Sequence, residues 1–175
     1  MAAVHPMLDE IRDLLAAPLA GSSADQLACH PAGDPSRWSA QQVVEHLIAS
    51  WRMTAAGIED RIRKGRPLKT HPTLRQHALR ILICELGYFP TGRSAPEAVR
   101  PAAQPPISGD QLIARISESL GTMDAMLARI EREAGGAPIL NQGLLGPLNV
   151  RQWRRFHRAH ARHHVAQLER AIHGR

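Results

Sequence analysis

Apolar side chains recur every three to four positions in several stretches of this chain, with polar and charged residues between them. That spacing places the apolar side chains on one face of an α-helix. It predicts long helices over 6–19, 40–64, 109–134 and 149–173, and a shorter helix over 73–86. In the first and third of these, the predicted inward positions are Leu8, Ile11, Leu15, Leu19, Leu112, Ile116, Leu120, Met123, Leu127 and Ile130.

Three of the long helices begin with the same arrangement of residues. A Ser or Asn at the N-cap is followed three positions later by Gln, and an apolar residue precedes the cap. The pairs are Ser39 with Gln42, Ser108 with Gln111, and Asn149 with Gln152. In such a capping box the two side chains bind backbone N–H groups that the first helical turn leaves unpaired. The pattern therefore fixes three helix starts.

The segments between the helices contain no alternation of apolar and polar residues that would indicate a strand. Segments 20–37 and 138–148 are connections, and 88–107 is a long crossover rich in proline. Long amphipathic helices joined in this way form bundles. The sequence predicts an all-α fold, a four-helix bundle with an extra short helix and a long proline-rich crossover, in a single domain over 1–175.

The formal net charge of +6 is carried almost entirely by arginine and is spread along the predicted helices next to acidic residues. The chain has only six aromatic residues, and basic residues do not alternate with them as they do in surfaces that stack bases. A solvated, arginine-rich helical surface explains this charge better than a nucleic-acid partner does.

Composition also bears on location. The 175 residues are 43% hydrophobic and contain no run of about 18 uncharged apolar residues, so we expect no membrane span. The first residues lack the charged and apolar regions of a secretion signal. Cys29 and Cys84 are too few for a disulfide framework, which favours a reducing, cytoplasmic location.

Histidines provide the candidate chemistry. His160 and His164 are four residues apart, so they lie one above the other on a helix, and the apolar stripe of 149–173 includes both. His46 lies on the predicted inward face of 40–64. Three neutral imidazoles can bind a divalent metal ion and leave a coordination position for water or substrate. His163 is at the edge of the stripe and His157 is displaced to its other side, so neither is a predicted ligand.

The alternative for each histidine is a hydrogen-bonded core residue, and His46 alone would more often be one. The combination of three inward histidines favours a metal site. No Glu follows the first histidine of the pair as it does in helical zinc proteases, and no inward carboxylate accompanies His46. Catalytic residues are therefore not identified, and a metal would have to supply the chemistry.

Two motifs resemble the DinB/YfiT-like family of helical bundles. The first is Trp38-Ser39-x5-Glu45-His46-Leu47. The second is Leu145-Gly146-x-Leu148-Asn149-x3-Trp153-x2-Phe156-x3-His160-x2-His163-His164-x2-Gln167. With the helix order, the resemblance covers essentially the whole chain. One departure is Gln142-Gly143, where close relatives often have His-Pro, and this leaves the finer subfamily open.

The resemblance implies an up-down-down-up bundle and a divalent metal, nickel or zinc, held by His46, His160 and His164. Relatives include thiol-dependent S-transferases and a maleylpyruvate isomerase. We therefore expect a metal-dependent enzyme, either a transferase that joins a low-molecular-weight thiol to a small electrophile or a hydrolase. The alternative is a non-enzymatic bundle that binds metal for stability or sensing.

Family members are often dimers, and apolar residues remain after one inward face is assigned. These are Trp51, Ile62, Ile81, Leu82 and Ile83. A leftover apolar surface favours a partner. We expect a homodimer formed through the helix at 73–86 or the flank of 40–64. The other explanation is that this short helix caps the bundle and buries those residues within one chain.

Overall fold

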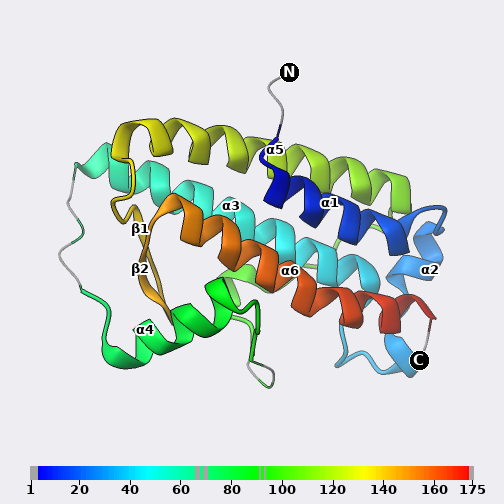
Figure 1. Cartoon of the computed structure of the whole chain (residues 1–175). Helices are drawn as coiled ribbons and strands as arrows, with labels where there is room; N and C mark the ends of the chain where they lie inside the picture. The colour runs from blue at the N-terminus through cyan, green and yellow to red at the C-terminus, as the bar shows by residue number, and fades with distance from the viewer. Residues whose placement is uncertain (1–3, 66–67, 69–70, 91, 93, 174–175) are drawn as a thin grey trace.

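A computed structural model describes residues 4–65, 68, 71–90, 92 and 94–173. The four long helices are α1 (Pro6–Leu19), α3 (Ala40–Lys64), α5 (Gly109–Ala134) and α6 (Val150–His173). Helix α1 contacts α5 and α6, and α3 contacts the same two helices, so these pairs form the four sides of a bundle. Helices α1 and α6 run in one direction and α3 and α5 in the other (Figure 1). The predicted all-α, up-down-down-up four-helix bundle is confirmed.

The core of the bundle consists of the predicted inward side chains. Every inward residue predicted for α1 and α5 is buried, and Trp51 of α3 is completely enclosed. Removing one leucine or isoleucine side chain from water stabilises the fold by about 1.5–3 kcal/mol. Among the described helices, none is long and apolar enough to cross a membrane.

The predicted helix starts are all present. Ser39 and Ser108 each form a full capping box with the Gln three residues later. At α6, Asn149 Oδ1 accepts from Gln152 N at 2.9 Å, and Gln152 Oε1 accepts from Asn149 N at 3.0 Å. A fourth box begins α4 (Leu74–Arg80) at Thr73.

The connections contain more structure than the sequence indicated. A short helix, α2 (Ala24–Ala28), and a 3₁₀ turn, η1 (Pro31–Gly33), lie between α1 and α3, and a second 3₁₀ turn, η3 (Glu97–Val99), lies in the crossover. Helix α4 continues as a π turn, η2 (Ile81–Glu85).

Before α6, β1 (Leu140–Gln142) and β2 (Gly146–Leu148) form an antiparallel hairpin in which Leu140 lies opposite Leu148. The expectation that 138–148 contains no strand was therefore wrong. Three-residue strands are too short to show the alternation that identifies a strand.

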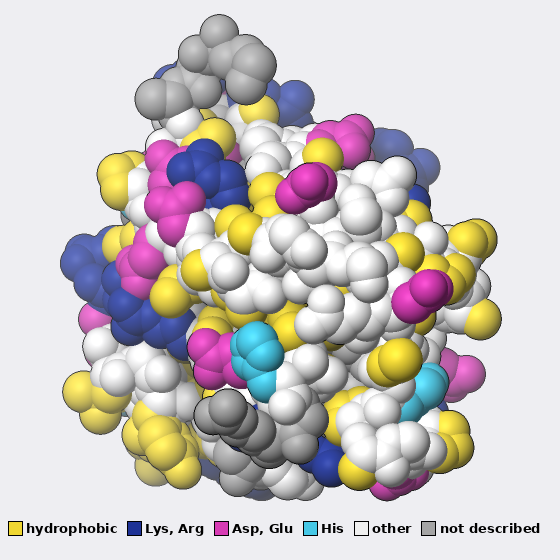
Figure 2. Space-filling model, turned by 90° about the vertical axis from the view of Figure 1, so that its right-hand side faces the viewer, with side chains coloured by type: hydrophobic (Ala, Val, Ile, Leu, Met, Phe, Trp, Pro, Cys, Tyr) yellow, Lys and Arg dark blue, Asp and Glu magenta, His cyan; other side chains and the backbone are white. Residues whose placement is uncertain are grey.

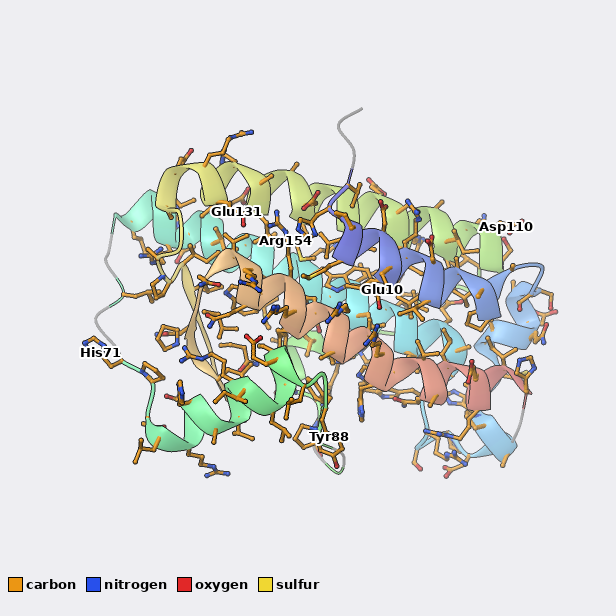
Figure 3. The ribbon with its side chains drawn as sticks, in the orientation of Figure 1. Glu10, His71, Tyr88, Asp110, Glu131 and Arg154 are labelled. Carbon is orange, nitrogen blue, oxygen red and sulfur yellow. The ribbon has the colours of Figure 1, made fainter. Side chains whose placement is uncertain are left out.

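An ion-pair network around the buried Arg154 ties α6 to α5. Arg154 is 3% exposed and binds Glu131 at 2.6 Å and Asp124 at 3.4 Å. Figure 3 shows Arg154 beside Glu131. Asp124 also accepts from His5 N at 2.9 Å, and the His5 imidazole caps α1 by accepting from Met7 N. His5 is therefore part of the α1 start.

Surface arginines lie close to acidic residues. Within α1, Arg12 binds Asp9, and across the α1–α6 side Arg158 and Arg162 both bind Glu10. Figure 2 shows acidic and basic side chains intermixed along one flank of the molecule. Such exposed pairs each contribute about 0–1 kcal/mol to stability, so they serve mainly to disperse the positive charge.

Candidate metal centre

Three histidines from two helices meet inside the bundle. His46 comes from α3, and His160 and His164 come from successive turns of α6. The Nε2 atom of His160 lies 3.2 Å from Nε2 of His46 and 3.1 Å from Nε2 of His164. One ligand atom from each residue lies within 4.8 Å of the others, and the side chains are 4–7% exposed. The structure thus brings together the three histidines that the sequence singled out.

Their positions follow from local helix geometry. His46 lies within the apolar face of α3, between the buried Val43 and Trp51. On α6, the four-residue spacing places His160 and His164 on one face, below Phe156 on the same stripe. The hydrophobic burial that fixes the two helices therefore also fixes the separation of the imidazoles.

Hydrogen bonds on the far side of two rings set their orientation. His46 Nδ1 donates to the carbonyl oxygen of Val99 at 2.8 Å, and His164 Nδ1 donates to Gln167 Oε1 at 2.9 Å. A carbonyl oxygen can only accept, so each Nδ1 carries the proton and each Nε2 presents a lone pair. Metal-binding histidines usually have such a partner on the second nitrogen.

The resulting donor set fits a metal ion. If His160 carried a proton on Nε2, this proton could be donated to Nε2 of His46 or to Nε2 of His164, but not to both. The lone pair of the remaining Nε2 atom would then be unpaired. If it carried the proton on Nδ1, that atom would have no acceptor among the described residues, and three lone pairs would face one another. A divalent ion would pair with all three, so His46, His160 and His164 could hold one.

Burial also keeps the imidazoles neutral. It lowers the pKa of His46, and it lowers the pKa of His160 well below 6.5, with further lowering by the neighbouring His164 and His46. Burial and the nearby His46 lower the pKa of His164 to about 4. Neutral imidazole is the form that binds a metal, so the site is ready for one at neutral pH.

A pocket of about 960 Å³ opens onto the three histidines. Its walls come from α3, the crossover, the β1–β2 hairpin and α6. Its apolar wall includes Trp38, Met53, Phe89, Leu140, Leu144 and Phe156. Phe89 stacks on the His160 ring, with 5.0 Å between ring centroids and 26° between the ring planes. A cavity of this size accommodates a small organic molecule beside the imidazoles.

The other histidines of α6 have different environments. His163 is half-buried and lines the pocket beside Phe89, with ring centroids 5.2 Å apart. His157 is completely buried in the core and lies 3.1 Å from Thr54 Oγ1. Its displacement from the metal-facing stripe agrees with the sequence, but its role as a core residue was not anticipated.

The contribution of the crossover to the site was not predicted from the sequence. Val99 orients His46, and Phe89 covers His160, yet both belong to a proline-rich segment without periodicity. A single apolar residue among prolines carries no signal of which side chain it will contact. Only the path of the chain across α3 and α6 brings these two residues to the site.

Comparison with known proteins agrees with this arrangement. Residues 7–168 match the profile of the DinB superfamily, and this range includes all three histidines and the four long helices apart from their outermost residues. Among curated proteins and among solved structures, no significant match is found. The match spans most of the chain and agrees with the motifs around His46 and His160, and on these grounds the chain belongs to the DinB superfamily.

Proposed function

We propose that this protein is a metal-dependent enzyme that joins a low-molecular-weight thiol to a small electrophile. In this proposal His46, His160 and His164 hold one divalent ion, nickel or zinc. Such an ion would bind a thiol as its thiolate and would lower the pKa of a bound water. The observation that carries the proposal is the open pocket beside three convergent imidazoles.

The chain itself would hold and shield the reactants. Val99 and Gln167 keep the Nε2 atoms of His46 and His164 directed to the centre. Phe89 and Phe156 both lie against His160 and exclude water from that side. The remaining pocket volume would receive the electrophile next to the sulfur.

The competing hypothesis is a non-enzymatic bundle in which the metal serves stability or sensing. A structural site is sealed and fully coordinated by protein. Among the described residues, only three side chains of suitable type converge here, and a pocket of about 960 Å³ adjoins them. Both observations favour a reactive site.

The lining of the pocket also favours thiol transfer over hydrolysis. Hydrolysis normally needs a general base for the attacking water, often a carboxylate. No Asp or Glu lines the pocket in the part of the chain that the structure describes. A thiol, whose pKa is much lower than that of water, needs less help to ionise, so thiol transfer is favoured.

A thiol screen tests the proposal. Glutathione, cysteine, bacillithiol and mycothiol would each be mixed with monochlorobimane and protein loaded with nickel or zinc. The sulfur displaces chloride, the proton passes to solvent, and the thioether is fluorescent. We expect turnover with at least one thiol that is lost on chelation and in the His160→Ala variant. If no thiol gives metal-dependent turnover, the proposal is wrong and the non-enzymatic hypothesis stands.

A further inference from the structure

The pocket beside the three histidines has an uneven charge. Its described lining contains no acidic side chain, while Arg100 at its wall carries a permanent positive charge. The rest of the described wall is apolar or carries neutral amide, hydroxyl and imidazole groups. An arginine at the edge of an otherwise uncharged pocket attracts an anionic group of a bound molecule more strongly than any other wall residue could.

The position of Arg100 is fixed by the turn that also orients the metal site. Arg100 directly follows η3, and its backbone N donates to Glu97 O at 3.0 Å. The preceding residue, Val99, accepts the Nδ1 proton of His46. The backbone of Arg100 is therefore held directly next to Val99, the residue that contacts His46.

The guanidinium of Arg100 is oriented but has no acidic partner. Its Nε donates to Ala95 O at 3.3 Å, which restrains the side chain along the crossover. No Asp or Glu in the described part of the chain forms a salt bridge with it. This contrasts with Arg154, Arg155 and Arg158 of α6, each of which binds an acidic residue. Among the described residues, none binds the two Nη groups of Arg100, so these groups are open to a ligand.

We propose that Arg100 binds a carboxylate of the small molecule that occupies the pocket, and that the apolar wall receives its hydrocarbon or aromatic part. The inference rests on the proposed function, because it describes a reactant of the same site. A guanidinium forms two parallel hydrogen bonds to a carboxylate, which gives direction as well as affinity. The carboxylate could belong to the thiol or to the electrophile.

Two matched probe pairs distinguish these sources. Hydrocinnamate and hydrocinnamyl alcohol differ only in the acid and contain no sulfur. Mercaptopropionate and mercaptopropanol make the same comparison for a thiol. Calorimetric affinities would be measured for the wild type, Arg100→Gln, Arg100→Lys and Arg129→Gln, with and without zinc. Arg129 is an exposed arginine of α5 that does not line the pocket, so it is the matched control.

We expect the wild type to prefer the acid in at least one pair, and Arg100→Gln to reduce that preference about fivefold to tenfold, as the loss of one charge-assisted pair at a partly solvated site would. Arg100→Lys should retain part of the preference, and Arg129→Gln all of it. If Arg100→Gln loses the preference for the acid in the hydrocinnamate pair, the carboxylate belongs to the electrophile. If the preference is lost only in the thiol pair, the carboxylate belongs to the thiol.

Two results would overturn the inference: equal affinity for acid and alcohol in the wild type, or an unchanged preference in Arg100→Gln. A preference that needs zinc and ignores Arg100 would show that the metal binds the acid, which also overturns it. Metal analysis of Arg100→Gln keeps the two proposals apart. That variant should bind as much zinc as the wild type, whereas failure of the proposed function would appear as absent metal in both proteins or as a zinc-loaded wild type that gives no turnover in the thiol screen.

Discussion

At the scale of single residues, His160 has a special place because its Nε2 lies within 3.2 Å of the Nε2 atoms of both His46 and His164. We therefore predict that His160→Ala abolishes binding of a divalent ion, because two remaining imidazoles leave the site underfilled. The wild type should hold about one ion per chain, with nitrogen ligands at roughly 2.0–2.1 Å, measured by elemental analysis and X-ray absorption.

The matched control is His163→Ala. His163 lines the pocket and contacts Phe89, but it is not one of the three convergent residues, so this variant should bind the ion normally. Full metal occupancy in a variant with His46, His160 and His164 all replaced by Ala would disprove the assignment of ligands.

His157 should make stability depend on pH. Burial lowers the pKa of His157 to about 3, from 6.5 for an exposed imidazole. A lowered pKa means that the folded state resists protonation, so the stability is fully present above pH 6.5 and is lost as the pH falls toward 3. Between pH 7 and pH 4.5 this residue alone should reduce the free energy of unfolding by about 2–3 kcal/mol.

Urea unfolding of chelated protein at several pH values measures this effect. Thr54 Oγ1 donates its proton to Ser50 O, so it accepts a hydrogen bond from His157 Nε2. The side-chain amide of a glutamine at position 157 can donate the same hydrogen bond, and it does not titrate. The His157→Gln variant should therefore lose less stability on acidification than the wild type, while His173→Gln at the exposed end of α6 should behave like the wild type. Identical pH profiles for all three proteins would contradict the prediction.

Residue patterns in the sequence identified the histidine cluster because helical periodicity is a local property. His46, His160 and His164 each fall on an apolar stripe of their own helix, so the sequence shows which side they face. The partners of their second nitrogens were not all predictable. Gln167 is one turn from His164 on the same stripe, whereas Val99 reaches His46 only through the path of the crossover.

At the scale of helices, the contact between the end of α1 and the start of α5 depends on Gly109. Its backbone N donates to Ser22 O at 3.0 Å, and a Cβ at this position would lie 1.9 Å from Leu19 O. We predict that Gly109→Ala lowers the free energy of unfolding by about 1–3 kcal/mol, because one of two backbones must shift. Urea denaturation would measure the change.

Gly121 is the matched control within the same helix, because a Cβ there would meet no heavy atom within 4 Å. Gly121→Ala should raise the free energy of unfolding by about 0.5–1 kcal/mol, since alanine restricts the unfolded chain and favours the helix. Equal effects of the two substitutions would show that the α1–α5 contact does not depend on the absence of a side chain at position 109.

Helix boundaries were predictable to about one residue wherever a capping box stood at the start, because the box is a contact within four residues. The β1–β2 hairpin was not predictable, since it is stabilised by packing between α3 and α6 rather than by an alternation of apolar and polar residues in its own strands. Leu140, for example, lies 3.0 Å from where a Cβ of Gly57 would be, so α3 accepts the hairpin closely only because that residue is glycine.

At the scale of the whole molecule, the four-helix order and the site are linked. Helices α3 and α6 form one side of the bundle, and the crossover between η2 and α5 covers that side on its way to the far end (Figure 1). The bundle thus buries three histidines between two helices, and the crossover supplies part of the pocket wall. Periodicity predicted the bundle, but the course of a proline-rich connection over its surface follows from long-range contacts alone.

Exposed apolar residues bear on whether the chain forms a homodimer. Of the apolar residues left over in the sequence, Trp51 and Ile83 are buried within the chain, so part of the short helix does cap the bundle. Exposed apolar side chains remain on α4, η2 and the turn after them, and these are Leu74, Ile81, Leu86 and Tyr88. Leu74 is 92% exposed and Leu86 72%. Figure 3 shows Tyr88 at the outer edge of this region.

Exposed apolar side chains favour a second copy of the chain, and a two-fold dimer would bring the α4–η2 segments of two chains together. We predict that sedimentation equilibrium at micromolar concentration gives twice the 19.2 kDa of one chain. Leu74→Glu combined with Leu86→Glu should give the monomer, because each dimer would bury four carboxylates without partners. Ala125→Glu, on an exposed position of α5, should leave the dimer intact. A wild-type mass near 19.2 kDa would rule the dimer out and leave these four side chains on the surface of a single chain.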